Sequence, residues 1–469
     1  MIAAAPTQAQ AQQSERLTAP RDQVWGAMLA SLAIAGAWLL FPDALVPIAA
    51  AILLWGALAV VFRPFLTCLV FVAFSYFRLH EAFPALHPLH IPQLAGIGAM
   101  FAFVLHFFVI QSVSLNWTRE LKLFVVFFAL VSAGTLVAVI PEVATAFWPG
   151  FAKIAIMTFA IAWLVRTVDD LALVNRLFVV CGLIIAGVAI YNSVNGIELV
   201  GSGRATIGRE LKSPIGDPND LAFVLLLPLS FAFAQLVHRS NTTNTLLAAL
   251  AVPAMIGAII ATQSRGGLIG LCVVTLAIGS QVVRSKFLLW SGCCVLALAL
   301  YFAMGIGQRN DIGEMRGGVD ESSYGRLYGW SAATKMALKR PLTGVGLDNF
   351  VGAYNDYRAG FDKADHAIHS SWFAVLAEIG FPGLIIFIAM IATSFKSIWR
   401  SRAMLAAGPF DPILRATALS LGAGLAGVCA AGTFLHQAFT WPLYIIIALT
   451  TGLASVAALG PPRGARLLE

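Results

Sequence analysis

Two histidines lie close together in the segment that leads into an apolar run late in the chain. His366 and His369 are three residues apart in Asp-His-Ala-Ile-His-Ser-Ser-Trp, so they share a face if a helix begins this early. A histidine near its neutral pKa suits the removal of a proton from a sugar hydroxyl. The alternative is a histidine that only caps the helix or bonds a neighbour. The pattern therefore indicates a candidate general base, and either histidine can fill the role.

Metal chemistry would need further ligands beside these histidines. The nearest acidic pair is Asp320 and Glu321, and the surrounding polar segments contain no clean Asp-x-Asp. We therefore expect no metal and no cofactor.

Several basic residues stand in short polar segments between apolar runs. Arg78 follows one run, Arg204, Arg209 and Lys212 share one polar loop, and Arg265 lies in Gln-Ser-Arg-Gly-Gly. Taken singly, each could reach to phospholipid headgroups. Together they indicate a site for an anionic, membrane-embedded group, because a forked guanidinium matches phosphate or pyrophosphate oxygens.

Three further polar residues admit a structural explanation. Glu378 lies nine residues after His369, in an apolar run, and a membrane carboxylate is a functional candidate by default, although it could simply orient an arginine or a helix end. Asp217 and Asn219 in Gly-Asp-Pro-Asn-Asp stand where a helix should begin, with Pro218 in the first turn. We interpret both as capping residues.

The elements that position these residues must be membrane helices. The chain has 469 residues, of which 59% are hydrophobic and 11% charged, and its mean hydropathy is +0.84. A soluble domain carries about 25% charged residues. This composition excludes a soluble enzyme, a nucleic-acid-binding protein and a secreted disulfide scaffold. All six cysteines fall in apolar stretches, so we expect buried thiols.

Apolar runs and their breakers predict an all-α polytopic membrane protein with about 12–14 transmembrane helices. The expected domains are a disordered cytoplasmic tail (1–23), transmembrane helices (24–305), a periplasmic helical loop (306–367), transmembrane helices (368–459) and a cytoplasmic tail (460–469). The expected spans lie near 24–41, 44–62, 64–78, 91–115, 121–140, 149–165, 177–195, 218–237, 245–263, 266–283, 287–305, 368–393, 413–435 and 438–459.

The orientation follows from the basic residues. With both termini inside, more than half of the 30 Lys and Arg residues fall in cytoplasmic connections or tails, as topology favours. They are Arg16, Arg21, Arg63, Arg119, Lys122, Arg166, Arg176, Arg239, Arg284, Lys286, Lys396, Arg400, Arg402, Arg415, Arg463 and Arg466. The sequence therefore predicts an N-in, C-in protein.

The long polar segment 306–367 is expected on the outer side as a small helical cap. Ser322 and Ser323 could cap a helix that runs to Lys339 and ends before Pro341. Its predicted packing face carries Leu327, Trp330, Thr334 and Leu338, and a second helix is expected over 348–357.

The order of these motifs resembles the O-antigen ligase and polymerase superfamily. The outer arginine loop is followed by DPNDLA, then SRGG, then PLTGVGLDNF, and finally HSSWFAVLAEIGFPGL. The resemblance covers about residues 200–390. The family's His-Asn/Ser-x-x-Leu segment aligns on His369 and Ser370, with Trp372 or Phe373 in place of the leucine, and its Leu-x-Glu-x-Gly segment contains Glu378.

The resemblance implies a metal-independent, inverting glycosyltransferase of the Gram-negative inner membrane, with its active site facing the periplasm. Its implied donor is an undecaprenyl-pyrophosphate-linked glycan, and its implied acceptor is lipid A–core oligosaccharide. His369 or His366 would be the catalytic base, and Arg265, Arg204, Arg209 and Arg78 would bind the pyrophosphate. Besides these substrates we expect the lipid bilayer as a partner, and no nucleic acid.

A ligase is favoured over other members of the superfamily, because the outer polar residues gather in one modest cap. The alternatives within the superfamily are an O-antigen polymerase and a protein O-oligosaccharyltransferase. A lipid-linked glycan transporter is the rival from another class. It would need polar groups through the middle of the spans, where His106 stands alone.

Overall fold

The computed structural model describes residues 32, 36, 45–113, 115–201, 203–303, 321–358, 366–408 and 411–459. Over these residues the chain is helical and contains no strand beyond one isolated bridge between Val200 and Arg204. Several predicted features lie outside the described residues: both tails, almost all of the first expected span, and residues 306–320 and 359–365 of the expected cap.

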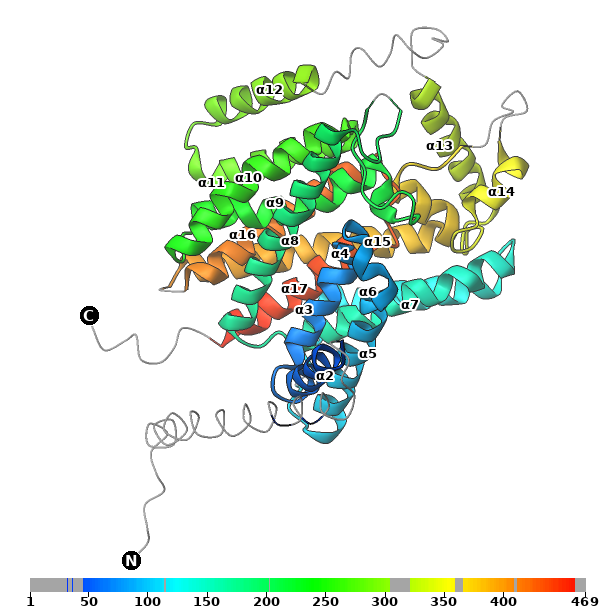
Figure 1. Ribbon diagram of the computed structural model, residues 1–469. Helices are drawn as coiled ribbons and strands as arrows, with labels where there is room; N and C mark the ends of the chain where they lie inside the picture. Colours follow the sequence, from blue (N-terminus) through cyan, green and yellow to red (C-terminus); the bar gives the residue numbers. More distant parts are fainter. Residues whose placement is uncertain are drawn as a thin grey trace, which may run out of the picture.

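The helices pack into one bundle, with α12 at its edge and the α13–α14 pair at one end (Figure 1). In chain order they are α2 (Leu45–Phe62), α3 (Pro64–Ser75), α4 (Leu79–Ala82), η1 (Pro84–Leu89), α5 (Ile91–Val104), η2 (Leu105–Val109), α6 (Arg119–Leu136), α7 (Pro141–Leu164), α8 (Val168–Asn195), η3 (Pro214–Gly216), α9 (Pro218–Val237), α10 (Thr242–Thr262), α11 (Arg265–Val282), α12 (Lys286–Ala303), α13 (Glu321–Lys339), α14 (Phe350–Tyr357), α15 (Ser371–Ala406), α16 (Pro412–Gly432) and α17 (Trp441–Ala458).

Within the described residues, nine helices are long and apolar enough to cross a membrane, which confirms a polytopic membrane protein. They are Ile91–Val109, α7, α8, α9, α10, α11, α15, α16 and α17, while Pro64–Ser75 and Lys286–Ala299 are shorter apolar helices. Each span expected from residue 44 onward coincides with a helix. The finer count of 12–14 spans and the N-in, C-in orientation stay predictions.

Several boundaries differ from those that the sequence predicted. α8 has 28 residues and α15 has 36, because polar residues at their ends stay helical instead of forming connections. Arg176, Lys396, Arg400 and Arg402 therefore lie within helices, and their assignment to loops was wrong. The same holds for four residues at the starts of α6, α12 and α16: Arg119, Lys122, Lys286 and Arg415. A helix that rises about 1.5 Å per residue can carry such side chains beyond the hydrocarbon core.

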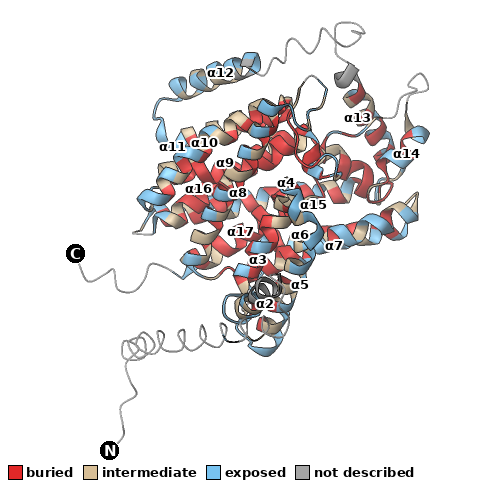
Figure 2. Cartoon of the chain, in the orientation of Figure 1, coloured by how far each residue is buried: buried red, intermediate tan, exposed pale blue. Residues whose placement is uncertain are grey.

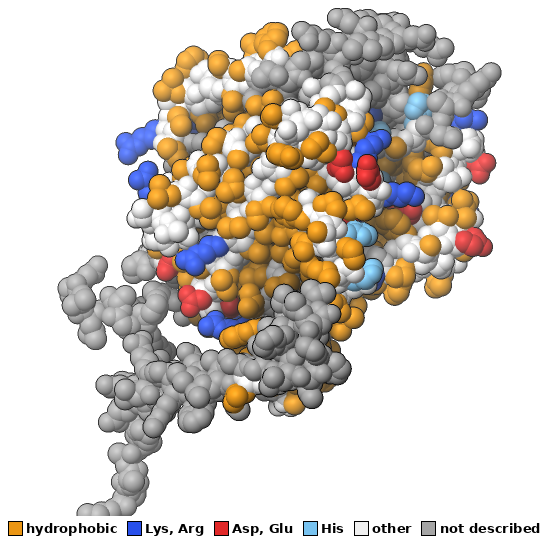
Figure 3. Space-filling view, in the orientation of Figure 1, with side chains coloured by type: hydrophobic (Ala, Val, Ile, Leu, Met, Phe, Trp, Pro, Cys, Tyr) orange, Lys and Arg blue, Asp and Glu red, His pale blue; other side chains and the backbone are white. Residues whose placement is uncertain are grey.

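The core of the bundle is formed by α9, α16 and α17. Leu221, Leu225 and Leu229 of α9 and Ile446 of α17 are fully buried. A helix that is apolar on all sides belongs in the interior, and Figure 2 shows these helices as the most buried part of the bundle, with α12 and much of α7 exposed. Hydrophobic side chains cover much of the face in Figure 3, as a lipid-contacting surface requires. All six cysteines are free thiols, but only Cys68 and Cys181 are buried and Cys294 is exposed, so the expectation of buried thiols was wrong for Cys294.

The long helix α15 is broken at Gly380, whose backbone (φ 75°, ψ −171°) is not helical. The turn after α13 provides hydrogen-bond partners for the backbone groups at this break. The Val345 and Gly346 amides donate to the carbonyls of Ala377 and Glu378, at 2.8 and 3.0 Å, and the Phe381 amide donates to Pro341 at 2.9 Å. These bonds join the cap to the bundle.

The two helices of the cap are present, but α13 begins at Glu321, so Ser322 and Ser323 lie inside the helix and the start predicted at them was wrong. The face predicted for α13 is packed only at the half-buried Trp330, whose Nε1 donates to the carbonyl of Ile368 at 3.2 Å. Leu327, Thr334 and Leu338 are exposed, whereas Ala333 and Met336 are fully buried. The buried face carries small residues, because the segment before α15 lies directly against it. A Cβ atom on Gly329 would lie 3.2 Å from the carbonyl oxygen of Ala367. The face of α13 that packs inward is therefore the one whose small side chains allow the segment before α15 to approach closely, and not the one with the larger apolar side chains.

Gly380→Ala should destabilise the protein by about 1–3 kcal/mol, because this backbone region is open only to glycine. The new Cβ would also stand 2.6 Å from the carbonyl oxygen of Pro341. Gly187→Ala is the control, since Gly187 is exposed on α8 and has no neighbour within 4 Å. Thermal denaturation in detergent should show a lower melting temperature for Gly380→Ala only. Equal melting temperatures would contradict the role of Gly380.

Candidate functional site

Asn219 ties two distant segments together at one end of the bundle. Its side-chain oxygen accepts hydrogen bonds from Nη2 of Arg204 at 2.8 Å and from Oγ of Ser264 at 2.9 Å. The predicted capping role is confirmed for Asp217, whose carboxylate accepts the Asn219 amide at 2.7 Å. It was wrong for the Asn219 side chain. That side chain instead holds the loop between α8 and α9, called here the arginine loop because it contains Arg204 and Arg209, against the start of α11.

Arg204 is also anchored to the backbone. Its Nε donates to the carbonyl of Thr262 at 2.9 Å, next to Gln263, which adopts a left-handed conformation (φ 50°). The guanidinium is thus oriented by the residues just before Arg265. Fixed orientation is what bidentate recognition of a phosphate requires.

Arg265 is the first residue of α11 and is half-buried. Ser264 caps the helix by accepting the Gly267 amide at 3.1 Å. A Cβ on Gly267 would lie 2.5 Å from Cβ of Ala222, so this glycine lets α11 begin in contact with α9. Arg265 therefore stands at a helix N-terminus, where backbone N–H groups favour an anion.

The remaining predicted arginines have different surroundings. Nε of Arg78 forms an ion pair with Oε2 of Glu81 at 3.0 Å, and the same oxygen accepts a hydrogen bond from Ser213. The Arg209 side chain is exposed, and its backbone amide donates to Glu198 at 3.3 Å. Arg78 thus joins, through Glu81, the α3–α4 connection to the arginine loop. Arg209 is exposed on the surface of that loop.

His369 precedes α15 and adopts a left-handed backbone (φ 41°), which is uncommon for a residue other than glycine. Burial lowers its pKa, and the charges of Arg326 and His366 lower it further, while the charge of Asp217 raises it. The imidazole is therefore neutral at pH 7. It also lies near enough to Asp217 to sense its charge, although the two residues are far apart in sequence.

His366 is held by the cap. Its ring lies 5.9 Å from the rings of both Tyr328 and Tyr354, measured between centroids. A Cβ on Gly325 would stand 2.7 Å from its Nδ1. Because α15 begins only at Ser371, the condition for a shared helix face is not met, and the two histidines do not share one.

A third histidine, His436, lies in the loop between α16 and α17. The loop is tied to α15 by Oγ of Ser371, which donates to the carbonyl of Leu435 at 2.8 Å and accepts the Gln437 amide at 2.9 Å. Burial, reinforced by the charge of His369, lowers the pKa of His436 to about 4. His436 was not among the candidates predicted from the sequence. Its signal was a His-Gln pair at a break between two apolar runs.

A cavity of about 530 Å³ opens beside this loop. Its polar lining includes Arg78, Asp220, His436 and Gln437, and Phe147 and Trp441 are among its apolar residues. Gln437 Nε2 donates to Asp220 at 2.6 Å and so fixes the loop to α9. The cavity combines an apolar wall with a cation, a carboxyl group and several uncharged polar groups, which suits an amphiphile with a polar head.

Glu378 serves the cap directly. It is buried, and its Oε2 accepts the Asp348 amide at 3.0 Å, two residues before α14 begins. Burial raises the pKa of Asp348. Of the two structural roles expected for Glu378, the contacts support the orientation of a helix end. No group of three or more His, Cys, Asp or Glu residues in the described ranges could hold a metal ion.

Residues 250–388 match the family model described as O-antigen ligase, a span that includes Arg265, His369 and Glu378. The resemblance seen in the sequence is thereby confirmed for this part of the chain, which carries an O-antigen ligase family domain. Proteins of this family are glycosyltransferase-like membrane enzymes that use lipid-linked glycans. Among curated proteins, none matches the chain.

Acidification should destabilise the protein partly through His436. Its folded-state pKa of about 4 lies below the ordinary value near 6.5. The unfolded chain therefore binds the extra proton first, and stability falls from pH 6.5 towards pH 4, by up to about 3 kcal/mol. His436→Gln should lose less in melting temperature than wild type between pH 7 and pH 4.5. His90→Gln, at an exposed position, should follow wild type, and identical pH profiles for all three proteins would refute the role.

Proposed function

We propose that this protein is an O-antigen ligase of the Gram-negative inner membrane. It transfers a glycan from undecaprenyl pyrophosphate to lipid A–core oligosaccharide on the periplasmic face, without a metal ion. One observation supports the proposal: a histidine with a lowered pKa, the anchored Arg204, and Arg265 at a helix N-terminus come from separate parts of the chain and lie at one end of the helix bundle.

The contacts that support this convergence run through Asn219. Asp217 lies near enough to His369 to raise its pKa, and Asn219, two residues later, bonds both Arg204 and Ser264. Arg265 follows Ser264 directly. A nucleophile activated at His369 would thus face a leaving group bound by Arg204 and Arg265. Arg209 lies in the same loop as Arg204, and Arg78 lies in the α3–α4 connection, which Glu81 joins to that loop.

The proposed reaction is a single displacement. The acceptor hydroxyl oxygen attacks the anomeric carbon, and the bond from that carbon to the pyrophosphate oxygen breaks. Neutral His369 takes the hydroxyl proton, while the bonding electron pair leaves with undecaprenyl pyrophosphate. Attack from the face opposite the leaving group inverts the anomeric configuration. The arginines stabilise charge that grows on the phosphate oxygens in a partly dry site, an effect worth several kcal/mol.

The cavity beside the His436 loop supports a lipid-linked donor. Its apolar wall includes Phe147, Phe151 and Ile154 of α7, and its polar end includes Arg78. An undecaprenyl chain can lie along such a wall while its pyrophosphate reaches the arginine loop. This arrangement requires the cap end of the bundle to face the periplasm, as the N-in, C-in prediction has it.

Three other activities remain as alternatives. A polymerase or a protein O-oligosaccharyltransferase of the superfamily would use the same donor chemistry with another acceptor. The single compact cap of α13 and α14 favours the ligase. A transporter is less well supported, because the charged residues discussed above gather at the ends of the bundle.

His369→Ala should reduce glycan transfer by about 10²–10⁴-fold, the usual contribution of a general base. His366→Ala is the matched control, because His366 contacts the aromatic rings of the cap. It should retain activity, at a lower melting temperature. The assay follows conversion of lipid A–core to a slower-migrating ladder on a gel. An active His369→Ala protein beside an inactive, folded His366→Ala protein would move the base to His366.

Arg265→Lys should keep the positive charge yet lose most of the transfer activity, because an ammonium cannot make two parallel bonds to pyrophosphate. Lys153→Arg is the reverse control, because Lys153 is exposed on α7 and does not line the donor cavity, and it should be neutral. Initial rates should be measured at saturating and at limiting donor. Near-normal rates for Arg265→Lys would exclude bidentate recognition.

A further inference from the structure

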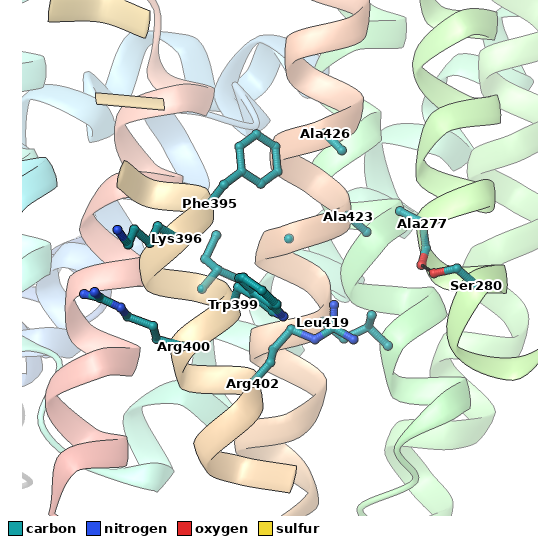
Figure 4. A pocket seen from close by; sticks show the side chains of 12 residues that line it. Ala277, Ser280, Phe395, Lys396, Trp399, Arg400, Arg402, Leu419, Ala423 and Ala426 are labelled. Carbon is teal, nitrogen blue, oxygen red and sulfur yellow. Dashed lines mark hydrogen bonds between the residues drawn. The ribbon is translucent and has the colours of Figure 1, made fainter. Parts of the chain in front are cut away.

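A second cavity, of about 680 Å³, lies at the opposite end of α15 from His369. It is formed by the last third of α15 together with α11 and α16 (Figure 4). Trp399 stands roughly 40 Å of helix beyond the start of α15, at 1.5 Å per residue. The cavity is therefore separate from the proposed active site and does not depend on the function assigned there.

The charge of this cavity is one-sided. Arg402 reaches from α15 towards α16, whereas the charged ends of Lys396 and Arg400, which also border the cavity, point away from α16 (Figure 4). Its lining includes no acidic residue. Nη2 of Arg402 donates to the neutral side chain of Gln281 at 2.5 Å, and within the described chain no carboxylate forms an ion pair with any of the three cations.

The surroundings add to the positive potential. His238, just after α9, has a pKa lowered by burial and then by the charges of Arg415 and Arg402. A smaller cavity of about 240 Å³ on the other side of α15 shares Lys396 and Arg400 but also contains Glu120. An anion is therefore better accommodated in the larger cavity, where no carboxylate offsets the cations.

The wall opposite the cations is apolar and narrow. Ala423 and Ala426 of α16 and Ala277 of α11 leave space for a chain, and Phe395 and Trp399 of α15 border it. Small side chains on facing helices produce a groove that a hydrocarbon tail can fill. An indole beside a guanidinium is also typical of the membrane interface, where headgroups lie.

We propose that this cavity binds an anionic phospholipid, with its phosphate at Arg402 and an acyl chain along the alanine-lined wall of α16. A basic pocket between transmembrane helices is a known form of lipid-headgroup site. A zwitterionic lipid offers the same chains but no net negative charge, so the site discriminates by charge. The N-in, C-in prediction puts this end of α15 in the cytoplasmic leaflet.

Binding can be measured on the full-length protein after delipidation in detergent. Native mass spectrometry would count bound phosphatidylglycerol during a titration, with phosphatidylethanolamine as the comparison lipid. Wild type should prefer phosphatidylglycerol by about fivefold, the value of one charge near a membrane surface. Arg402→Gln should remove that preference. Arg239→Gln, which deletes an exposed charge that does not line the cavity, should keep it.

A second variant tests the groove for the acyl chain without removing a charge. Ala426→Leu fills the groove while leaving every cation in place, and it should weaken phosphatidylglycerol binding about as much as Arg402→Gln. Equal binding of both lipids to wild type would overturn the proposal, as would unchanged binding by both variants. Displacement of the lipid by inorganic phosphate alone would also overturn it in favour of a site for free phosphate. Stronger retention of undecaprenyl phosphate would make the cavity a polyprenyl site instead.

Discussion

The position of the cap and of the candidate site depends on the break in α15 at Gly380. In a membrane, backbone N–H and C=O groups released from a helix need partners within the protein, because hydrocarbon offers none. The turn around Gly344 supplies them through Val345, Gly346 and Pro341, and Glu378 adds its bond to the Asp348 amide. A Cβ on Gly344 would come within 2.4 Å of the Ala377 carbonyl oxygen. The junction therefore needs a glycine in each of its two segments, Gly344 in the turn and Gly380 in α15.

That junction determines where the candidate base stands. With α13 and α14 fixed against α15, the small face of α13 packs on Ala367 and Gly325 lies against His366. The chain then enters α15 through His369 in a left-handed conformation. Gln263, before Arg265, and Arg78 also have left-handed backbones. Such conformations persist where the surrounding packing enforces them, and here they accompany the residues assigned to pyrophosphate binding and proton transfer.

Hydropathy was enough to predict the helical membrane fold from the sequence, because each apolar run from residue 44 onward has its own helix. It failed at helix ends, as for Arg400 and Arg402, where polar side chains extend a helix beyond the hydrocarbon. It failed for α13 as well, since the packing face was chosen by close approach. Gly325, Gly329 and the alanines pack inward, and the larger Leu327 and Leu338 are exposed.

The candidate site was predicted in part. The basic loop, SRGG and the His369 segment follow from residue type and order, and Arg204, Ser264 and Asp217 lie close enough to be linked through Asn219. The bridging role of Asn219 was not predictable, because a side chain at a helix start caps more often than it bonds a distant loop. His436 was missed for a similar reason: its significance comes from three-dimensional contacts with the start of α15, which its local sequence does not encode.

The fate of the lipid-linked donor tests the central claim most directly. Purified protein would be incubated in detergent with undecaprenyl-pyrophosphate glycan and lipid A–core, in the presence of EDTA, and both substrates would be followed by gel electrophoresis and mass spectrometry. The account predicts a slower-migrating lipopolysaccharide ladder together with release of undecaprenyl pyrophosphate. A lengthened lipid-linked glycan without a ladder would contradict the ligase and indicate a polymerase, and an intact donor would contradict glycosyl transfer altogether.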